Sequence, residues 1–266
     1  LSLLILLPVV SFNAKGKPLN KKDLMDCFAK EELVELVLAG NKGDIKKIDE
    51  LVAQGIDVNY KGKKNITPLY AQMPSMNIQG FKRLLEHGAD PNIPMEDGYS
   101  VIWLAASAGA HTNISIELLK LCLEHGGNPN LMFHKKYKEP NHTAFEDGLP
   151  LITGAIVLSG HPIEVIKMLL QYGADINLKD ERGGRTPLMV AVPSHYEVAY
   201  FLLQAGADFT AKDLYGNNSF ITFIEQFPVS CTPDGKISVA EQKQWRQKVI
   251  AFLIEKGIEV HLKYPD

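Results

Sequence analysis

The stretch LLEHGADPN at residues 84–92 decides the fold, because related phrases return along the chain. Each phrase ends a helix with apolar residues, stops it with a glycine in a left-handed conformation and continues into a short polar turn. The sequence therefore predicts about six copies of one structural unit. The other copies are LVAQGIDVN at 51–59, CLEHGGNPN at 122–130, LLQYGADIN at 169–177, LLQAGADFT at 202–210 and the weaker LIEKGIEVH at 253–261.

The spacing of the glycines indicates the type of unit. Their separations are 33, 38, 47, 33 and 51 residues, and a period of 33 is typical of a β-turn followed by two antiparallel helices. We therefore expect an all-α solenoid, in which each copy buries its apolar faces against its neighbours. The glycines are Gly55, Gly88, Gly126, Gly173, Gly206 and Gly257.

Two further phrases, ITPLYA at 66–71 and RTPLMVA at 185–191, match the start of the first helix in such a unit. With the Gly-Ala-Asp phrases, they make the chain resemble the ankyrin-repeat family. The resemblance implies an ankyrin-repeat domain over residues 30–266, with Thr67 and Thr186 as helix caps. The other copies depart from the pattern, with Ser100-Val101 and Leu149-Pro150 in place of Thr-Pro.

The composition limits the partners that the chain could bind. Its 266 residues carry a formal net charge of −3, with 28 Lys and Arg against 31 Asp and Glu, so no overall positive field attracts nucleic acid. No Walker loop, nucleophile elbow, His-Glu-x-x-His or Cys-x-x-Cys motif occurs in the sequence. We expect a non-catalytic protein that binds another protein and has no cofactor or small-molecule substrate. Membrane association stays open.

An insertion interrupts the repeats at residues 131–148, which read LMFHKKYKEPNHTAFEDG. Exposed aromatic residues beside cations are typical of protein interfaces, so we predict that this insert projects toward a partner. The finger tip around Met95 and Tyr99, with the neighbouring Trp103, would form the other wall of the site. The alternative is a tolerated insertion whose Phe133 and Phe145 fold back onto the repeats. The predicted partner-binding residues are Met95, Tyr99, Trp103, Phe133, His134, Lys135, Lys136, Tyr137 and Lys138.

One phrase near the end of the chain, SCTPDGKISVAE at 230–241, resembles a degenerate EF-hand loop. Only Asp234 and Glu241 would contribute carboxylates, so they are weak candidates for a metal site. The alternative is a Pro-Asp-Gly turn followed by a capping box, in which Ser238 and Glu241 begin a helix. We favour the turn and the cap.

The first residues suggest where the protein works. The apolar run LSLLILLPVV at 1–10 is too short to span a bilayer and resembles the hydrophobic region of an export signal, which we place at 1–14. A hydrophobic terminal element is the alternative. An amphipathic lead-in would follow at 15–29. Three cysteines cannot all pair in disulfides, and Cys122 stands where the other copies carry a core leucine. A periplasmic location therefore fits better than that of a disulfide-rich extracellular protein.

An ankyrin array behind an export signal resembles the periplasmic immunity proteins with which bacteria neutralise secreted antibacterial toxins. This resemblance implies that the chain occludes a cognate toxin, such as a type VI lipase effector. Two rival hypotheses are a general scaffold or adaptor in the cell envelope and an enzyme or metal-dependent module in the lengthened last copy.

Overall fold

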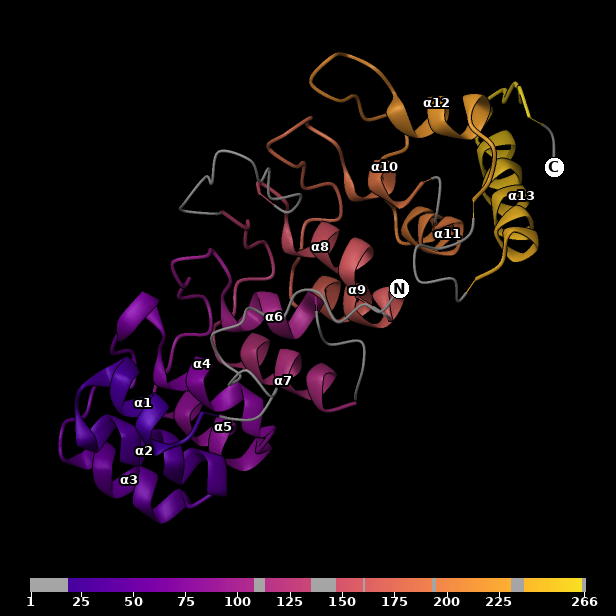
Figure 1. Ribbon diagram of the computed structural model, residues 1–266. Coiled ribbons are helices and arrows are strands. Elements are labelled where there is room, and N and C mark those ends of the chain that lie inside the picture. Colours follow the sequence, from indigo (N-terminus) through magenta and orange to yellow (C-terminus); the bar gives the residue numbers. More distant parts are fainter. Residues whose placement is uncertain are drawn as a thin grey trace. The chain divides into compact units, whose positions relative to one another are not determined.

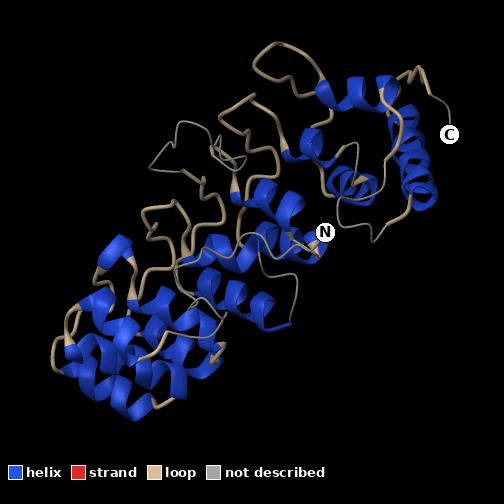
Figure 2. Ribbon diagram, viewed as in Figure 1, coloured by secondary structure: helices blue, strands red, loops and turns tan. Residues whose placement is uncertain are grey.

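The computed structural model describes residues 19–107, 113–134, 147–159, 161–192, 195–230 and 237–264, and the predicted export signal at 1–14 lies outside them. Helices and loops make up these ranges, and no strand occurs in them (Figure 2). The all-α prediction is therefore confirmed. The chain divides into two compact units, Leu1–Asp147 and Gly148–Asp266, and the predicted insert spans the boundary between them. No helix in the described ranges is long and apolar enough to cross a membrane.

The first unit holds one leading helix and three helix pairs. Each pair corresponds to one predicted repeat, and two short 3-10 helices lie in the connections. The elements are α1 (Lys21–Phe28), α2 (Glu31–Lys42), α3 (Ile45–Ala53), η1 (Lys63–Asn65), α4 (Pro68–Gln72), η2 (Met73–Ser75), α5 (Ile78–Glu86), α6 (Val101–Ser107) and α7 (Asn113–Glu124).

The second unit contains three more helix pairs, so the described residues contain the six repeats that the sequence predicts. Its last helix is the longest of the chain's described helices, with 17 residues. The elements are α8 (Leu151–Leu158), α9 (Pro162–Gln171), α10 (Pro187–Ala191), α11 (Tyr196–Gln204), α12 (Ser219–Gln226) and α13 (Val239–Glu255).

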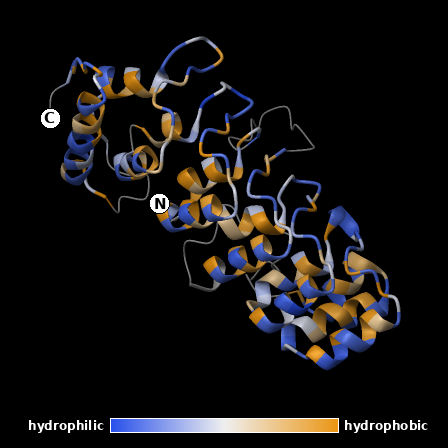
Figure 3. Ribbon diagram, turned by 180° about the vertical axis from the view of Figure 1, so that it is seen from behind, coloured by the Kyte–Doolittle hydropathy of each residue, from blue (hydrophilic) through white to orange (hydrophobic). Residues whose placement is uncertain are grey.

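Each helix pair packs on its sequence neighbour within its unit (Figure 1). In the first unit α2 contacts α3, α4 and α5, and α5 also contacts α7; in the second, α8 contacts α10, and α11 contacts α9 and α13. The buried side chains are mainly Leu, Ile, Val and Ala, and Figure 3 shows hydrophobic and hydrophilic residues alternating around the helices. This nearest-neighbour burial is the stabilising principle of a solenoid.

The helix boundaries follow the predicted signals. Thr67 accepts a hydrogen bond from the backbone N–H of Tyr70, and Thr186 caps α10 in the same way. Ser100 replaces threonine in the third copy and caps α6 through Trp103 N. All six predicted helix-stop glycines adopt left-handed φ angles, namely Gly55 (90°), Gly88 (85°), Gly126 (88°), Gly173 (89°), Gly206 (93°) and Gly257 (81°).

Asparagine side chains link the turns of successive repeats. Asn59 donates to Gly88 O at 2.9 Å and accepts from Asp90 N at 2.7 Å. One repeat later, Asn92 makes the same pair of bonds to the next turn, again at 2.9 Å and 2.7 Å. Polar backbone groups of the turns are thus satisfied from the adjacent repeat, which fixes the stacking register.

The first and last described helices have contacts that the inner ones lack. The lead-in forms α1, which begins with a capping box between Asn20 and Asp23 and buries Leu24 and Phe28 completely or almost completely. In α13, the buried Arg246 donates hydrogen bonds to the backbone carbonyl oxygens of Ile224 in α12 and of Tyr264. It thereby links α12, α13 and the segment around Tyr264.

Candidate protein-binding surface

The apolar residues of the predicted insert site are part of the protein core. Phe133 is only 1% exposed, and its ring lies 4.8 Å from that of Tyr99 and 5.0 Å from that of Trp103, measured between centroids. Met95 and Trp103 are also buried. The prediction that Phe133 projects toward a partner is therefore wrong, and Met95 and Trp103, which we expected to form the other wall of the site, lie in the core. Burying their aromatic and thioether surface stabilises the fold.

Of the remaining predicted residues, the structure describes only Tyr99 and His134. Tyr99 is half-buried beside Phe133, whereas His134 is exposed. The other four predicted residues lie outside the described ranges, namely Lys135, Lys136, Tyr137 and Lys138. Phe145 lies outside them too. For Phe133, the structure shows the alternative, a side chain that folds back onto the repeats.

The segment that resembles an EF-hand loop begins a helix. Glu241 accepts hydrogen bonds from the backbone N–H and the hydroxyl of Ser238, each at 2.8 Å, and Ser238 accepts from Glu241 N at 3.3 Å. This is the predicted capping box of α13. Asp234 lies outside the described ranges. Within those ranges no group of three or more His, Cys, Asp or Glu is arranged to hold a metal ion.

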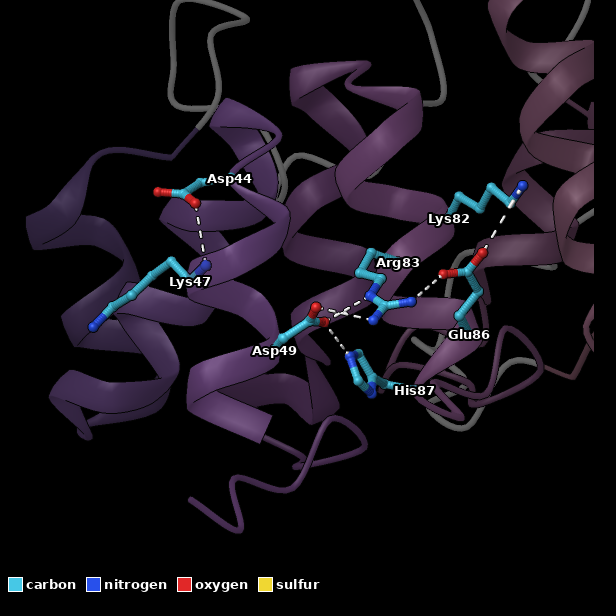
Figure 4. A network of polar contacts seen from close by, with 7 residues as sticks. All are labelled: Asp44, Lys47, Asp49, Lys82, Arg83, Glu86 and His87. Carbon is cyan, nitrogen blue, oxygen red and sulfur yellow. Dashed lines mark hydrogen bonds and ion pairs between the residues drawn. The ribbon is translucent and has the colours of Figure 1, made fainter. Parts of the chain in front are cut away.

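A polar network that the sequence analysis does not predict connects α3 and α5 (Figure 4). Asp49 accepts two hydrogen bonds from Arg83 and lies 2.7 Å from His87 Nε2, while Arg83 also donates to Glu86. The Arg83 hydrogen bonds, then that of His87, lower the pKa of Asp49 to about 2. Every charge in this network has a partner, so it links two helices and is a poor candidate for a reactive site.

The most exposed large apolar side chains among the described residues occur at the tip of the loop that leads into α12. Tyr215 is 79% exposed and its neighbour Leu214 is 69% exposed. The loop combines hydrophilic and hydrophobic residues (Figure 3). Exposed tyrosine and leucine side chains at a loop tip supply the apolar area that an interface buries.

The backbone of this tip is fixed by its own turn. Asp213 accepts hydrogen bonds from Tyr215 N at 2.9 Å and from Asn217 N at 3.0 Å, and from the hydroxyl of Ser219. The Ser219 bond is the main reason that the pKa of Asp213 is lowered, since it stabilises the charged carboxylate. A partner would meet a preformed turn, which reduces the entropic cost of binding.

The turn of the preceding repeat, at residues 179–185, is hydrogen-bonded to the tip. Leu214 N donates to Gly183 O at 2.9 Å, and Lys179 Nζ donates to Lys212 O at 2.7 Å. These two bonds join the turns directly, so both turns set the position of the tip. We call the turn that carries the tip, residues 212–217, the apolar finger.

The sequence contains a signal for the apolar finger. Leu214 and Tyr215 stand at the centre of a turn, where the preceding copy carries the hydrophilic residues DERGG at 180–184. Leu214 lies against Gly184 of the preceding turn but stays 69% exposed, and Tyr215 is 79% exposed, so the change from charged to apolar residues at this turn is a sequence signal for a binding surface.

Comparison with known proteins identifies the family. The sequence matches the family described as ankyrin repeats (3 copies) over residues 70–180 and 130–213, which together cover more than half of the chain. The chain belongs to the ankyrin-repeat family. Ankyrin repeats mediate protein–protein interactions, and the chain is accordingly a protein-binding module.

Several curated relatives share the repeats. The ankyrin repeat protein FPV222 of Fowlpox virus (strain NVSL) is 30% identical over 153 residues, which are 58% of this chain and 18% of that protein. The nuclear factor NF-kappa-B p105 subunit of Gallus gallus is 27% identical, with 51% of this chain and 13% of that protein covered. An ankyrin repeat protein of Rickettsia felis is 29% identical, with coverages of 52% and 40%. The chain thus spans less than half the length of these relatives.

Solved structures show the same fold. EF0377, an ankyrin repeat protein, superposes with a TM-score of 0.56 at 24% identity and covers 83% of this chain and 96% of its own. The ankyrin repeat domain of Bcl-3 gives a TM-score of 0.57 at 20% identity, with coverages of 85% and 86%. At these identities, the likeness concerns the fold alone.

Proposed function

We propose that the chain is an exported protein that binds a secreted bacterial toxin and blocks access to the toxin's active site. The main observation in support of a binding surface is the exposure of Leu214 and Tyr215, by 69% and 79%, at the tip of a hydrogen-bonded turn. Such side chains stabilise a complex by leaving water when a partner covers them.

The apolar run at residues 1–10 supports export, since it has the length of the hydrophobic region of a signal sequence and is followed by a polar flank. A protein that meets a toxin in the periplasm needs such a signal. Inhibition then requires only that the complex covers the mouth of the toxin's active site, so the binder itself needs no catalytic group. Tight inhibitors commonly bury about 1,600 Å² in total, more than one finger provides, so further repeats would take part.

The experiment is to isolate the protein from its native cells, identify the protein bound to it and locate both in cell fractions. The proposal expects a periplasmic complex with a secreted toxin, and protection of cells in which that toxin is directed to the periplasm. A cytoplasmic protein bound to a resident, non-toxic partner would contradict it and favour the scaffold hypothesis.

A further inference from the structure

A second finger, in the first unit, concentrates positive charge. The loop between α3 and α4 reads YKGKKN at residues 60–65, and Lys61, Lys63 and Lys64 are all exposed. Within the described part of the chain, none of these three lysines takes part in an ion pair. We call residues 60–65 the lysine finger. Its charge is local, because the whole chain has a formal net charge of −3.

The backbone of the lysine finger is closely constrained. Gly62 N donates to Ile66 O at 2.9 Å, and Asn65 N donates to Gly62 O at 3.0 Å. Lys64 and Asn65 both have left-handed φ angles, 58° and 59°; this conformation costs free energy at lysine, whereas asparagine tolerates it better. A surrounding structure must hold such a turn in place. The backbone that carries the three lysines is therefore a fixed turn.

Neighbouring side chains set the balance of charge around the finger. Lys30 Nζ lies 4.4 Å from the centroid of the Tyr60 ring, which brings a fourth ammonium group to the base of the finger. Acids also lie nearby, among them Asp23 and Asp26 on α1, which contacts η1, and Glu96, whose backbone N–H donates to Lys64 O at 3.1 Å. The carboxylate of Asp23 is already bonded within the cap of α1. Asp57, just before the finger, and Asp97, beside Glu96, are further acids. The positive charge is therefore concentrated in the finger itself, where residues 60–65 include three lysines and no acid.

We propose that the lysine finger binds an acidic segment of the partner protein. This inference rests on the proposed function, because it names the chemistry of the partner's surface. Grouped lysines attract an acidic segment to one place on a chain whose formal net charge is −3. Such an arrangement orients the partner and speeds its association.

The test uses the full chain and a fluorescent oligo-glutamate peptide, with a neutral oligo-glutamine peptide of equal length for comparison. We expect the acidic peptide to bind at low salt and to weaken as salt screens the charges, and the neutral peptide not to bind. The triple variant Lys61→Gln, Lys63→Gln and Lys64→Gln should lower the affinity for the acidic peptide about tenfold or more. Fluorescence anisotropy measures each affinity.

A matched control removes the same charge elsewhere in the first unit. Lys46, Lys82 and Lys120 each pair with a glutamate four residues later on a helix, so their triple replacement by Gln should change the affinity less than about twofold. Equal losses in both variants, or no binding by the wild-type chain, would overturn the inference. Stronger binding of a short oligonucleotide than of the acidic peptide would also overturn it. The peptide assay contains no toxin, so a negative result would overturn the role of the lysine finger without deciding whether the chain inhibits a toxin.

Discussion

The carboxylate of Asp49 on α3 and the guanidinium of Arg83 on α5 form a two-point contact between successive repeats. Oδ1 lies 2.6 Å from Nε, and Oδ2 lies 2.9 Å from Nη2 (Figure 4). The residues are 34 positions apart in the sequence, close to one repeat period. Both side chains are about one-third exposed, so solvent screens the pair, and its contribution to stability is modest.

This contact makes the stability of the first unit depend on pH. The pKa of Asp49 falls from its ordinary 3.8 to about 2 in the folded protein. The stabilisation is therefore fully present well above pH 3.8, and it is lost as the pH falls toward about 2, where the folded protein also takes up the proton. We expect Asp49→Asn to lower the melting temperature at pH 7, by an amount that shrinks below about pH 4.

Thermal unfolding followed by circular dichroism across this pH range measures the difference. Glu117→Gln is a suitable control, because Glu117 is an exposed acid on α7 and its replacement removes the same charge away from the contact. A difference between wild type and Asp49→Asn that stays constant down to pH 2 would show that the contact does not lower the pKa of Asp49.

The close approach of α2 and α5 predicts a large effect from one added methyl group. A Cβ atom at Gly80 would overlap the backbone oxygen of Gly40 and lie 2.7 Å from its carbonyl carbon, which cannot move without displacing α2. Alanine favours helices by about 1 kcal/mol over glycine, but here we expect Gly80→Ala to reduce the free energy of unfolding by about 1–3 kcal/mol. Chemical denaturation measures it. Gly183→Ala, whose nearest contact would be 3.5 Å, is the control, and a stabilised Gly80→Ala variant would refute the packing described.

The burial of Phe133 predicts that the start of the insert is needed for folding. Phe133→Ala removes a ring that contacts Tyr99 and Trp103, so we expect a loss of about 3–5 kcal/mol in the free energy of unfolding. The exposed ring of Tyr215 provides the control, since Tyr215→Ala should change stability by less than about 0.5 kcal/mol. If Phe133→Ala unfolds like the wild type but no longer binds the partner, the residue acts at an interface after all.

The two described cysteines should differ in reactivity. Cys122 is completely buried, and this burial strongly raises the pKa of its thiol, whereas Cys27 is only half-buried. Because the thiolate is the reactive form, Cys122 should resist alkylation in the folded protein and react once denaturant unfolds it. Peptide mass spectrometry after brief labelling distinguishes the sites. Modification of Cys122 in native protein at the rate of Cys27 would be inconsistent with its place in the core.

The repeat period and the helix boundaries could be predicted from sequence because they depend on local chemistry. The left-handed Gly88 and the cap formed by Thr67 are determined by the conformations that these residues allow. The direction of Phe133 could not be predicted in this way, because it depends on the space between Tyr99 and Trp103. The contact between α3 and α5 could have been predicted, because Asp49 and Arg83 carry opposite charges about one repeat period apart, and such residues face each other on successive repeats.

The most direct test of the central claim is a titration of the native partner's activity with the chain and with the variant Leu214→Ser, Tyr215→Ser. Both side chains are exposed, so the variant should keep the wild-type melting temperature. We predict that the wild-type chain abolishes the activity of a toxin at equimolar amounts, and that the variant needs about tenfold more, since exposed aromatic anchors typically contribute about 2 kcal/mol or more. Full activity of the partner in a saturated complex, or equal inhibition by both proteins, would contradict the proposed inhibition through the apolar finger.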